Sequence, residues 1–128
     1  MARILLIDDD RRVRAMMRRI LAFVGHEIHE AEDGRQGLER FHAIAPALVI
    51  SDIIMPEQEG METIRLLRKE APHLPILATS GGGTTASGVS YLRMAKRLGA
   101  SAVLEKPFNT YNLISLVAQL LSGAAPVR

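Results

Sequence analysis

The regular alternation of short apolar runs with helical patterns constrains the fold of this chain most. Apolar runs lie at residues 4–7, 47–50, 76–78 and 102–104, with a weaker one at 27–31. Strands that alternate with helices are typical of βαβ units and of a parallel sheet. Nearly continuous apolar strands fit a sheet that is covered on both faces. We therefore predict an α/β fold, a three-layer (βα)5 doubly wound parallel sheet of the flavodoxin type.

The segment after the first apolar run has the clearest helical pattern. Its apolar residues recur at helical spacing and predict one buried face, made of Val13, Met16, Met17, Ile20, Leu21 and Val24. Asp10 is placed to cap the start of this helix, and Gly25 to end it. Further helices are expected over residues 35–43, 61–70 and 87–98, and from residue 109 or 110 onwards.

Length and composition restrict the class of protein. The chain has 128 residues, which fits one domain, and 48% of them are apolar, which fits a globular core. It has no cysteine, so disulfides and Cys-based metal sites are excluded. The net charge of +2 gives no reason to expect nucleic-acid binding. Because no apolar run approaches the ~20 residues of a membrane span and no signal peptide is recognisable, we expect no membrane insertion and a cytoplasmic location.

Basic residues cluster on the first predicted helix. Five arginines lie within nine positions: Arg11, Arg12, Arg14, Arg18 and Arg19. Such a run is compatible with a solvated helix face, which is the ordinary case. It is also compatible with a docking surface for an acidic partner.

Polar residues follow the predicted strands at the points where the apolar runs stop. They are Asp8, Asp9 and Asp10, then Asp52, then Thr79 and Ser80, and finally Lys106. Each has an ordinary structural explanation when taken alone, such as a helix cap, a turn or a surface charge. Ligands of doubly wound sheets, however, bind at the carboxyl ends of the strands, where these side chains would meet. Clustered carboxylates call for a cation, and Mg²⁺ prefers such oxygen ligands. With a lysine and a hydroxyl, they indicate a site for a phosphoryl group.

Four motifs in this order resemble the receiver domains of two-component response regulators of the CheY type. They occupy residues 4–10, residues 48–56 with Gly60, residues 78–81 and residues 99–108. The resemblance extends from residue 3 to about residue 121. It implies that residues 1–121 form a receiver domain and that residues 122–128 form a short tail. It also implies a function in phosphorelay signal transduction, in which Asp52 accepts a phosphoryl group from a phosphohistidine.

The resemblance further implies a role for each residue around Asp52. Asp9, Asp52 and the backbone carbonyl of Ile54 would bind Mg²⁺, with Asp8 positioning the metal through water.

Two residues would contact the phosphoryl group. Lys106 would pair with one of its oxygens, and Ser80 would bond another. A cis peptide bond would precede Pro107.

Three features depart from the family pattern. Val103 stands where an aromatic residue is usual, so signalling through a rotating ring is not expected. Ile54, two residues after Asp52, offers no polar side chain. The interval between Ser80 and Lys106 is about four residues longer than usual, and the excess lies in the glycine-rich residues 81–88. We expect a mobile loop there and a displaced or shortened start of the next helix. These glycines lack the lysine of a P-loop.

The partners implied are a histidine kinase or histidine phosphotransfer protein and a downstream protein target that the sequence does not name. The chain would be a monomer or a weak dimer and would catalyse only its own Mg²⁺-dependent phosphorylation and dephosphorylation. Because about seven residues follow the last predicted helix, we expect a stand-alone receiver. Two alternatives stay open: an unphosphorylated pseudo-receiver that acts as a protein-interaction module, and a phosphatase with an aspartyl nucleophile.

Overall fold

The computed structural model describes residues 1–53, 59–81 and 90–123, without the side chains of Glu59 and Leu92. Strands and helices alternate within these ranges. The strands are β1 (Arg3–Ile7), β2 (Glu27–Ala31), β3 (Leu48–Asp52), β4 (Ile76–Ser80) and β5 (Ala102–Glu105). The helices are α1 (Arg11–Phe23), α2 (Gly34–Ile44), α3 (Glu59–Glu70), α4 (Tyr91–Arg97) and α5 (Thr110–Ser122).

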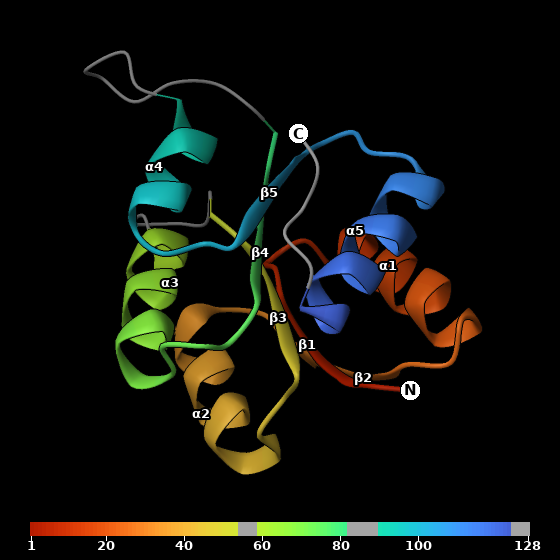
Figure 1. Cartoon of the computed structure of the whole chain (residues 1–128), viewed down its shortest axis with the longest axis horizontal. Helices are drawn as coiled ribbons and strands as arrows, with labels where there is room; N and C mark the ends of the chain where they lie inside the picture. The colour runs from red at the N-terminus through yellow and green to blue at the C-terminus, as the bar shows by residue number, and fades with distance from the viewer. Residues whose placement is uncertain (54–58, 82–89, 124–128) are drawn as a thin grey trace.

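All neighbouring strands are parallel, and their spatial order is β2-β1-β3-β4-β5. Helices α1 and α5 cover one face of this sheet, and α2, α3 and α4 cover the other (Figure 1). Two hydrophobic cores result, because successive side chains of a strand point to opposite faces. In β1, Ile4 and Leu6 belong to the core under α1 and α5, whereas Leu5 and Ile7 belong to the opposite core. The predicted doubly wound fold is confirmed.

Short polar side chains start the helices, as the sequence indicates. The Asp10 carboxylate accepts hydrogen bonds from the backbone N–H groups of Arg12 and Val13 at the start of α1. After α1, Gly25 adopts a φ of 99°, a left-handed conformation that costs glycine little. Asn109 caps α5 by accepting from the backbone of Asn112. Capping of this kind satisfies N–H groups that have no partner inside the helix.

The prediction of the buried face of α1 was wrong at two positions. Met17 is 1% exposed and Leu21 fully buried, but Met16 and Val24 are each 41% exposed. Met16 lies about 100° around the helix from Met17, at the margin of the buried stripe. Val24 is the C-cap residue, beyond the last helical turn. The spacing of apolar residues thus predicted correctly which side of α1 is buried, but it included too many residues in the buried face.

Helix α4 begins later than the predicted start at residue 87. Its first helical residue is Tyr91, and the Ser90 hydroxyl caps it by accepting from the backbone N–H of Arg93. The loop predicted over residues 81–88 lies outside the described residues except for Gly81. In the parts of the chain that the structure describes, no helix is both long and apolar enough to cross a bilayer.

Candidate functional site

The sheet register brings three of the predicted site residues to one level. Ile7 pairs with Ser51, so Asp8 follows β1 beside Asp52, and Asp52 pairs with Thr79 of β4. Asp8 is fully buried and Asp52 is 5% exposed, whereas Asp9 is exposed. Asp8, Asp9 and Asp52 can each offer a carboxylate oxygen such that these oxygens lie within 4.8 Å of one another. The three carboxylates that were expected to lie together are therefore close in space.

Lys106 supplies the opposite charge. Its ammonium Nζ lies 3.0 Å from Oδ2 of Asp8 and 3.6 Å from Oδ1 of Asp52. The backbone N–H of Lys106 donates to the carbonyl of Ser80 at 2.6 Å, which links the end of β5 to β4. The peptide bond between Lys106 and Pro107 is cis, as the resemblance implied. One ammonium therefore faces two carboxylates that burial would otherwise leave poorly solvated.

Asp8 is held rigidly by its neighbours. Its carboxylate Oδ1 accepts a hydrogen bond of 2.8 Å from the backbone N–H of Asp10. Its backbone N–H donates to the carbonyl of Ala31, and its own carbonyl accepts from Nη1 of Arg14 at 2.6 Å. This role of Arg14 is not visible in the sequence, because a side chain that bonds a backbone carbonyl requires no particular residue at the acceptor position. These contacts fix the Asp8 carboxylate that meets Lys106.

The end of β3, with Ile53 that follows it, approaches α3 closely. A Cβ atom built on Gly60 would lie against the carbonyl oxygen of Asp52 and 2.7 Å from the Cα of Ile53. Side chains larger than hydrogen therefore do not fit here without movement of the strand end that carries Asp52. Ser80 at the end of β4 is fully buried. Ile54, predicted to offer a carbonyl ligand, lies outside the described residues.

Two surface grooves lie along α1, and one of them borders the site. One of about 330 Å³ is lined by Val13, Met16, Lys106, Pro107 and Phe108. Its lining is almost entirely apolar except for Lys106, which also belongs to the carboxylate site. The exposed Met16 thus lies on the wall of a groove that borders the candidate site.

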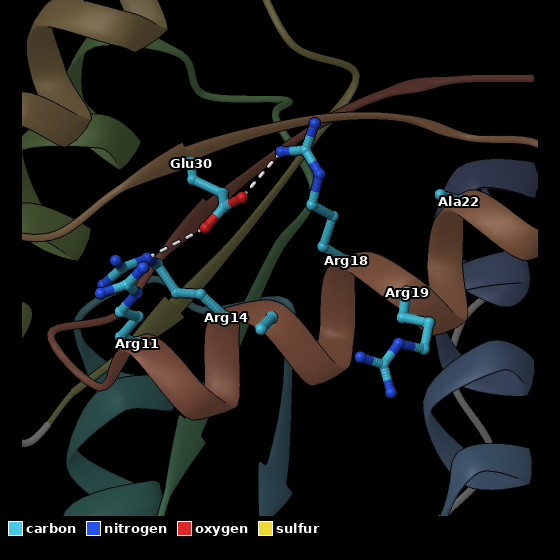
Figure 2. Close-up of a pocket in the computed structure, with 7 residues that line it drawn as sticks. Arg11, Arg14, Arg18, Arg19, Ala22 and Glu30 are labelled. Carbon is cyan, nitrogen blue, oxygen red and sulfur yellow. Dashed lines mark hydrogen bonds and ion pairs between the residues drawn. The ribbon is translucent and has the colours of Figure 1, made fainter.

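The second groove, of about 450 Å³, runs along the basic face of α1. It is lined by Arg11, Arg14, Ala15, Arg18, Arg19, Ala22 and Glu30. Glu30 of β2 accepts from Arg14 at 3.1 Å and from Arg18 at 2.7 Å, while Arg19 points away from it (Figure 2). Burial acts to raise the pKa of Glu30, but hydrogen bonds from these two arginines outweigh it and hold that pKa below its ordinary value. One carboxylate thus faces two of the five arginines.

The fold and the site together define a class of protein: a doubly wound α/β domain with a carboxylate cluster and a lysine at the carboxyl edge of its sheet. The family model described as the response regulator receiver domain matches residues 4–118. The chain belongs to this family and is a receiver of two-component phosphorelay signalling. Receivers of this family interact with histidine kinases or phosphotransfer proteins.

Curated relatives agree with this assignment. The response regulator MprA of Mycolicibacterium vanbaalenii is 36% identical over 124 residues, which cover 97% of this chain and 52% of the relative. The MprA protein of Mycobacterium leprae is also 36% identical, over 97% of this chain and 53% of its own length. The chain therefore spans about half the length of these relatives.

Solved structures show the same fold. The chemotaxis protein CheY4 of Vibrio cholerae superposes with a TM-score of 0.82 at 30% identity and covers 94% of this chain and 98% of its own. The receiver domain of NtrX from Brucella abortus gives a TM-score of 0.85 at 31% identity, over 94% of this chain and 99% of its own. The likeness thus extends over nearly the whole length of both structures.

Proposed function

We propose that Asp52 is the residue that accepts the phosphoryl group. The observation that carries this proposal is the position of Lys106, whose ammonium faces the Asp52 carboxylate at 3.6 Å while it is hydrogen-bonded to Asp8. A carboxylate is a weak nucleophile toward an anionic phosphoryl group, so a fixed positive charge at the point of attack favours the reaction. Asp52 is 5% exposed and lies at the carboxyl edge of the sheet, where ligands of doubly wound folds bind.

In the transfer that we propose, the phosphoryl group moves from a phosphohistidine to the Asp52 carboxylate. A carboxylate oxygen of Asp52 forms a bond to phosphorus while the phosphorus–nitrogen bond of a phosphohistidine breaks. The leaving imidazole keeps the bonding electron pair and takes up a proton from solvent. Lys106 is placed to pair with a phosphoryl oxygen, and the buried Ser80 to bond another after a shift of the end of β4. Hydrolysis of the acyl phosphate by water would return the Asp52 carboxylate and release inorganic phosphate.

The donor set fits a magnesium ion. Asp8, Asp9 and Asp52 provide hard carboxylate oxygens within 4.8 Å of one another, and Asp9 is exposed to solvent. Mg²⁺ prefers such oxygens and keeps part of its water shell, which an exposed carboxylate allows. Asp9 and Asp52 would bind the ion, and Asp8 would orient its water. When bound, the ion would neutralise charge between the carboxylates and the phosphoryl oxygens.

We further propose that the basic face of α1 docks an acidic surface of the histidine phosphodonor. Arg14 and Arg18 share Glu30, and Arg14 also bonds the carbonyl of Asp8, so these two arginines have structural contacts. Arg11 and Arg19 are exposed and line the same groove. Charge complementarity of this kind raises association rates and favours acidic partners.

Charge reversal at Arg11 and Arg19 tests the docking proposal without disturbing Asp8. The kinase to use is the histidine kinase that phosphorylates the wild-type chain fastest. Phosphoryl transfer from it to the double variant Arg11→Glu, Arg19→Glu should be slower than to the wild type. Phosphorylation of this variant by acetyl phosphate should stay unchanged, because a small donor needs no docking surface. Equal slowing with both donors, or with neither, would contradict the proposal.

Incubation with acetyl phosphate and Mg²⁺ tests the role of Asp52. Intact-mass spectrometry should show one added phosphoryl group on the wild-type chain and none on Asp52→Asn. Asp10→Asn is the matched control, since it neutralises a nearby carboxylate but leaves a residue that caps α1 well. It should be labelled like the wild type. A wild-type chain without the adduct, or an adduct that persists in Asp52→Asn, would contradict the proposal and favour a pseudo-receiver.

A further inference from the structure

Thr79 is a buried polar side chain that the phosphorylation site does not yet explain. Its residue is fully buried at the end of β4. Among the described residues, its hydroxyl Oγ1 is a buried side-chain atom without a hydrogen-bond partner. A buried donor or acceptor without a partner costs roughly 1–3 kcal/mol, so native proteins rarely keep one without a reason. The position of Thr79 points to such a reason.

The sheet places Thr79 directly beside Asp52. The two residues pair in the register of β3 and β4. They also share a face, because Leu77 and Ile50, each two residues earlier, both belong to the core under α1 and α5. Asp8 flanks Asp52 on the β1 side, so Thr79 flanks it on the β4 side. On β5, Leu104 pairs with Thr79 and presents no polar group to it. Of the two strand partners of Thr79, Asp52 is therefore the polar one.

Lys106 approaches the carboxylates from the β5 side of Thr79. Its ammonium has three N–H donors, and the hydrogen bond to Asp8 uses one of them. Its distance of 3.6 Å to Asp52 exceeds the roughly 2.7–2.9 Å of a charge-assisted hydrogen bond. The pair of Lys106 and Asp52 is thus an ion pair without a close hydrogen bond. A hydroxyl that can donate and accept at once is chemically suited to join the two.

We propose that Thr79 is a positioning residue for Asp52 and Lys106 during phosphoryl transfer. The hydroxyl is unpaired among the described residues before the reaction. During transfer it comes to donate to an oxygen of Asp52 and to accept from the Lys106 ammonium as that ammonium turns from Asp8 toward the phosphoryl oxygens. The hydroxyl thereby holds the nucleophile and the positive charge in the relative position that transfer needs. This inference rests on the proposed function of Asp52 and adds a residue to its site.

Thr79→Val is the variant that tests the proposal, because valine keeps the shape of threonine and removes the hydroxyl. Thr79→Ser is the matched control, because it keeps the hydroxyl and removes the methyl group. The rate of phosphorylation by acetyl phosphate with Mg²⁺ should fall about tenfold in Thr79→Val, as expected for the loss of a hydrogen bond to a charged group. Thr79→Ser should stay within about twofold of the wild type. The melting temperature of Thr79→Val should not fall, because the described part of the chain makes no hydrogen bond with this hydroxyl.

The possible outcomes separate this inference from the proposed function. If both variants are phosphorylated at the wild-type rate, the role of Thr79 is overturned, whatever happens to the melting temperature. Asp52 would then remain the proposed phosphoacceptor. Equal slowing in valine and serine variants would overturn it too, since packing and not the hydroxyl would then matter. A wild-type chain that takes no phosphoryl group on Asp52 would overturn the proposed function itself.

Discussion

The ammonium of Lys106 lies 3.0 Å from the Oδ2 atom of Asp8, a residue 98 positions earlier in the chain. The contact forms because β1 and β5 both end at the carboxyl edge of one parallel sheet, with β3 and β4 between them. Asp8 is fully buried, and the Lys106 side chain is 21% exposed. The lysine thus neutralises a carboxylate that water hardly reaches, while the same ammonium faces Asp52.

Removal of this lysine should destabilise the fold as well as the site. Lys106→Met leaves the buried Asp8 carboxylate without its ammonium, and we expect the free energy of unfolding to fall by roughly 1–3 kcal/mol. Chemical denaturation measures the change. Lys69→Met, at an exposed position on α3, is the control and should stay within about 0.5 kcal/mol of the wild type. Equal stability of the two variants would mean that the Asp8 contact contributes nothing.

Mg²⁺ should stabilise the wild-type chain more than a chain that lacks the Asp52 carboxylate. A ligand that binds only the folded state stabilises it by about 2.7 kcal/mol at a hundredfold excess over its dissociation constant. Without Mg²⁺, Asp52→Asn should be about 1 kcal/mol more stable than the wild type, because one of three neighbouring negative charges is gone. Thermal melts with Mg²⁺ and with a chelator measure both effects. The same Mg²⁺-dependent shift in Asp52→Asn and wild type would argue against Asp52 as a ligand.

The meeting of the site residues could largely be predicted, because they directly follow or end the strands of a parallel sheet. The sequence shows where each apolar run stops, and a parallel sheet brings those points together, so Asp8, Asp52 and Lys106 were expected to meet. The contact of Arg14 with the carbonyl of Asp8 was not predictable, since any residue could supply that acceptor. The hydroxyl of Thr79, unpaired among the described residues, was likewise not predictable, because its lack of a partner depends on how β4 packs between β3 and β5.

The wrong assignment of Met16 has a related cause. Helical spacing marks the residues on one side of a helix, but the width of the buried stripe depends on how closely the helix lies on the sheet. The neighbouring segment around Phe108 leaves a groove next to Met16, which no periodicity reveals.

Gly60 should resist substitution although it lies in a helix, where alanine ordinarily stabilises by about 1 kcal/mol. In Gly60→Ala the new Cβ would meet the carbonyl of Asp52 and the backbone of Ile53, so we expect a loss of roughly 1–3 kcal/mol in the free energy of unfolding. Gly81→Ala is the control for stability, because a Cβ there meets no atom of the described residues within 4 Å, its chain neighbours aside. A Gly60→Ala variant that is more stable than the wild type would show that α3 moves freely away from β3.

The ionised Glu30 side chain should stabilise the folded chain, and this stabilisation should be lost at acidic pH. Its pKa in the folded chain lies below the ordinary value of 4.5 because Arg18 and Arg14 stabilise its charged form against the opposing effect of burial. A lowered pKa stabilises the folded state above pH 4.5, and that contribution disappears as the pH falls through the folded-state value. The melting temperature of the wild type should therefore exceed that of Glu30→Gln near neutral pH. The difference between the two melting temperatures should vanish in acid. A difference that is constant with pH would show that the charge of Glu30 is not involved.

The position of the phosphoryl group within the chain tests the assignment of Asp52 most directly. After reaction with acetyl phosphate and Mg²⁺, borohydride reduction converts an aspartyl phosphate to homoserine, which peptide mass spectrometry assigns to a single position. We predict homoserine at residue 52, none at Asp8 or Asp9, and none anywhere when the donor is omitted. Homoserine at another aspartate, or its absence from a chain that carries the phosphoryl adduct, would contradict the assignment of Asp52.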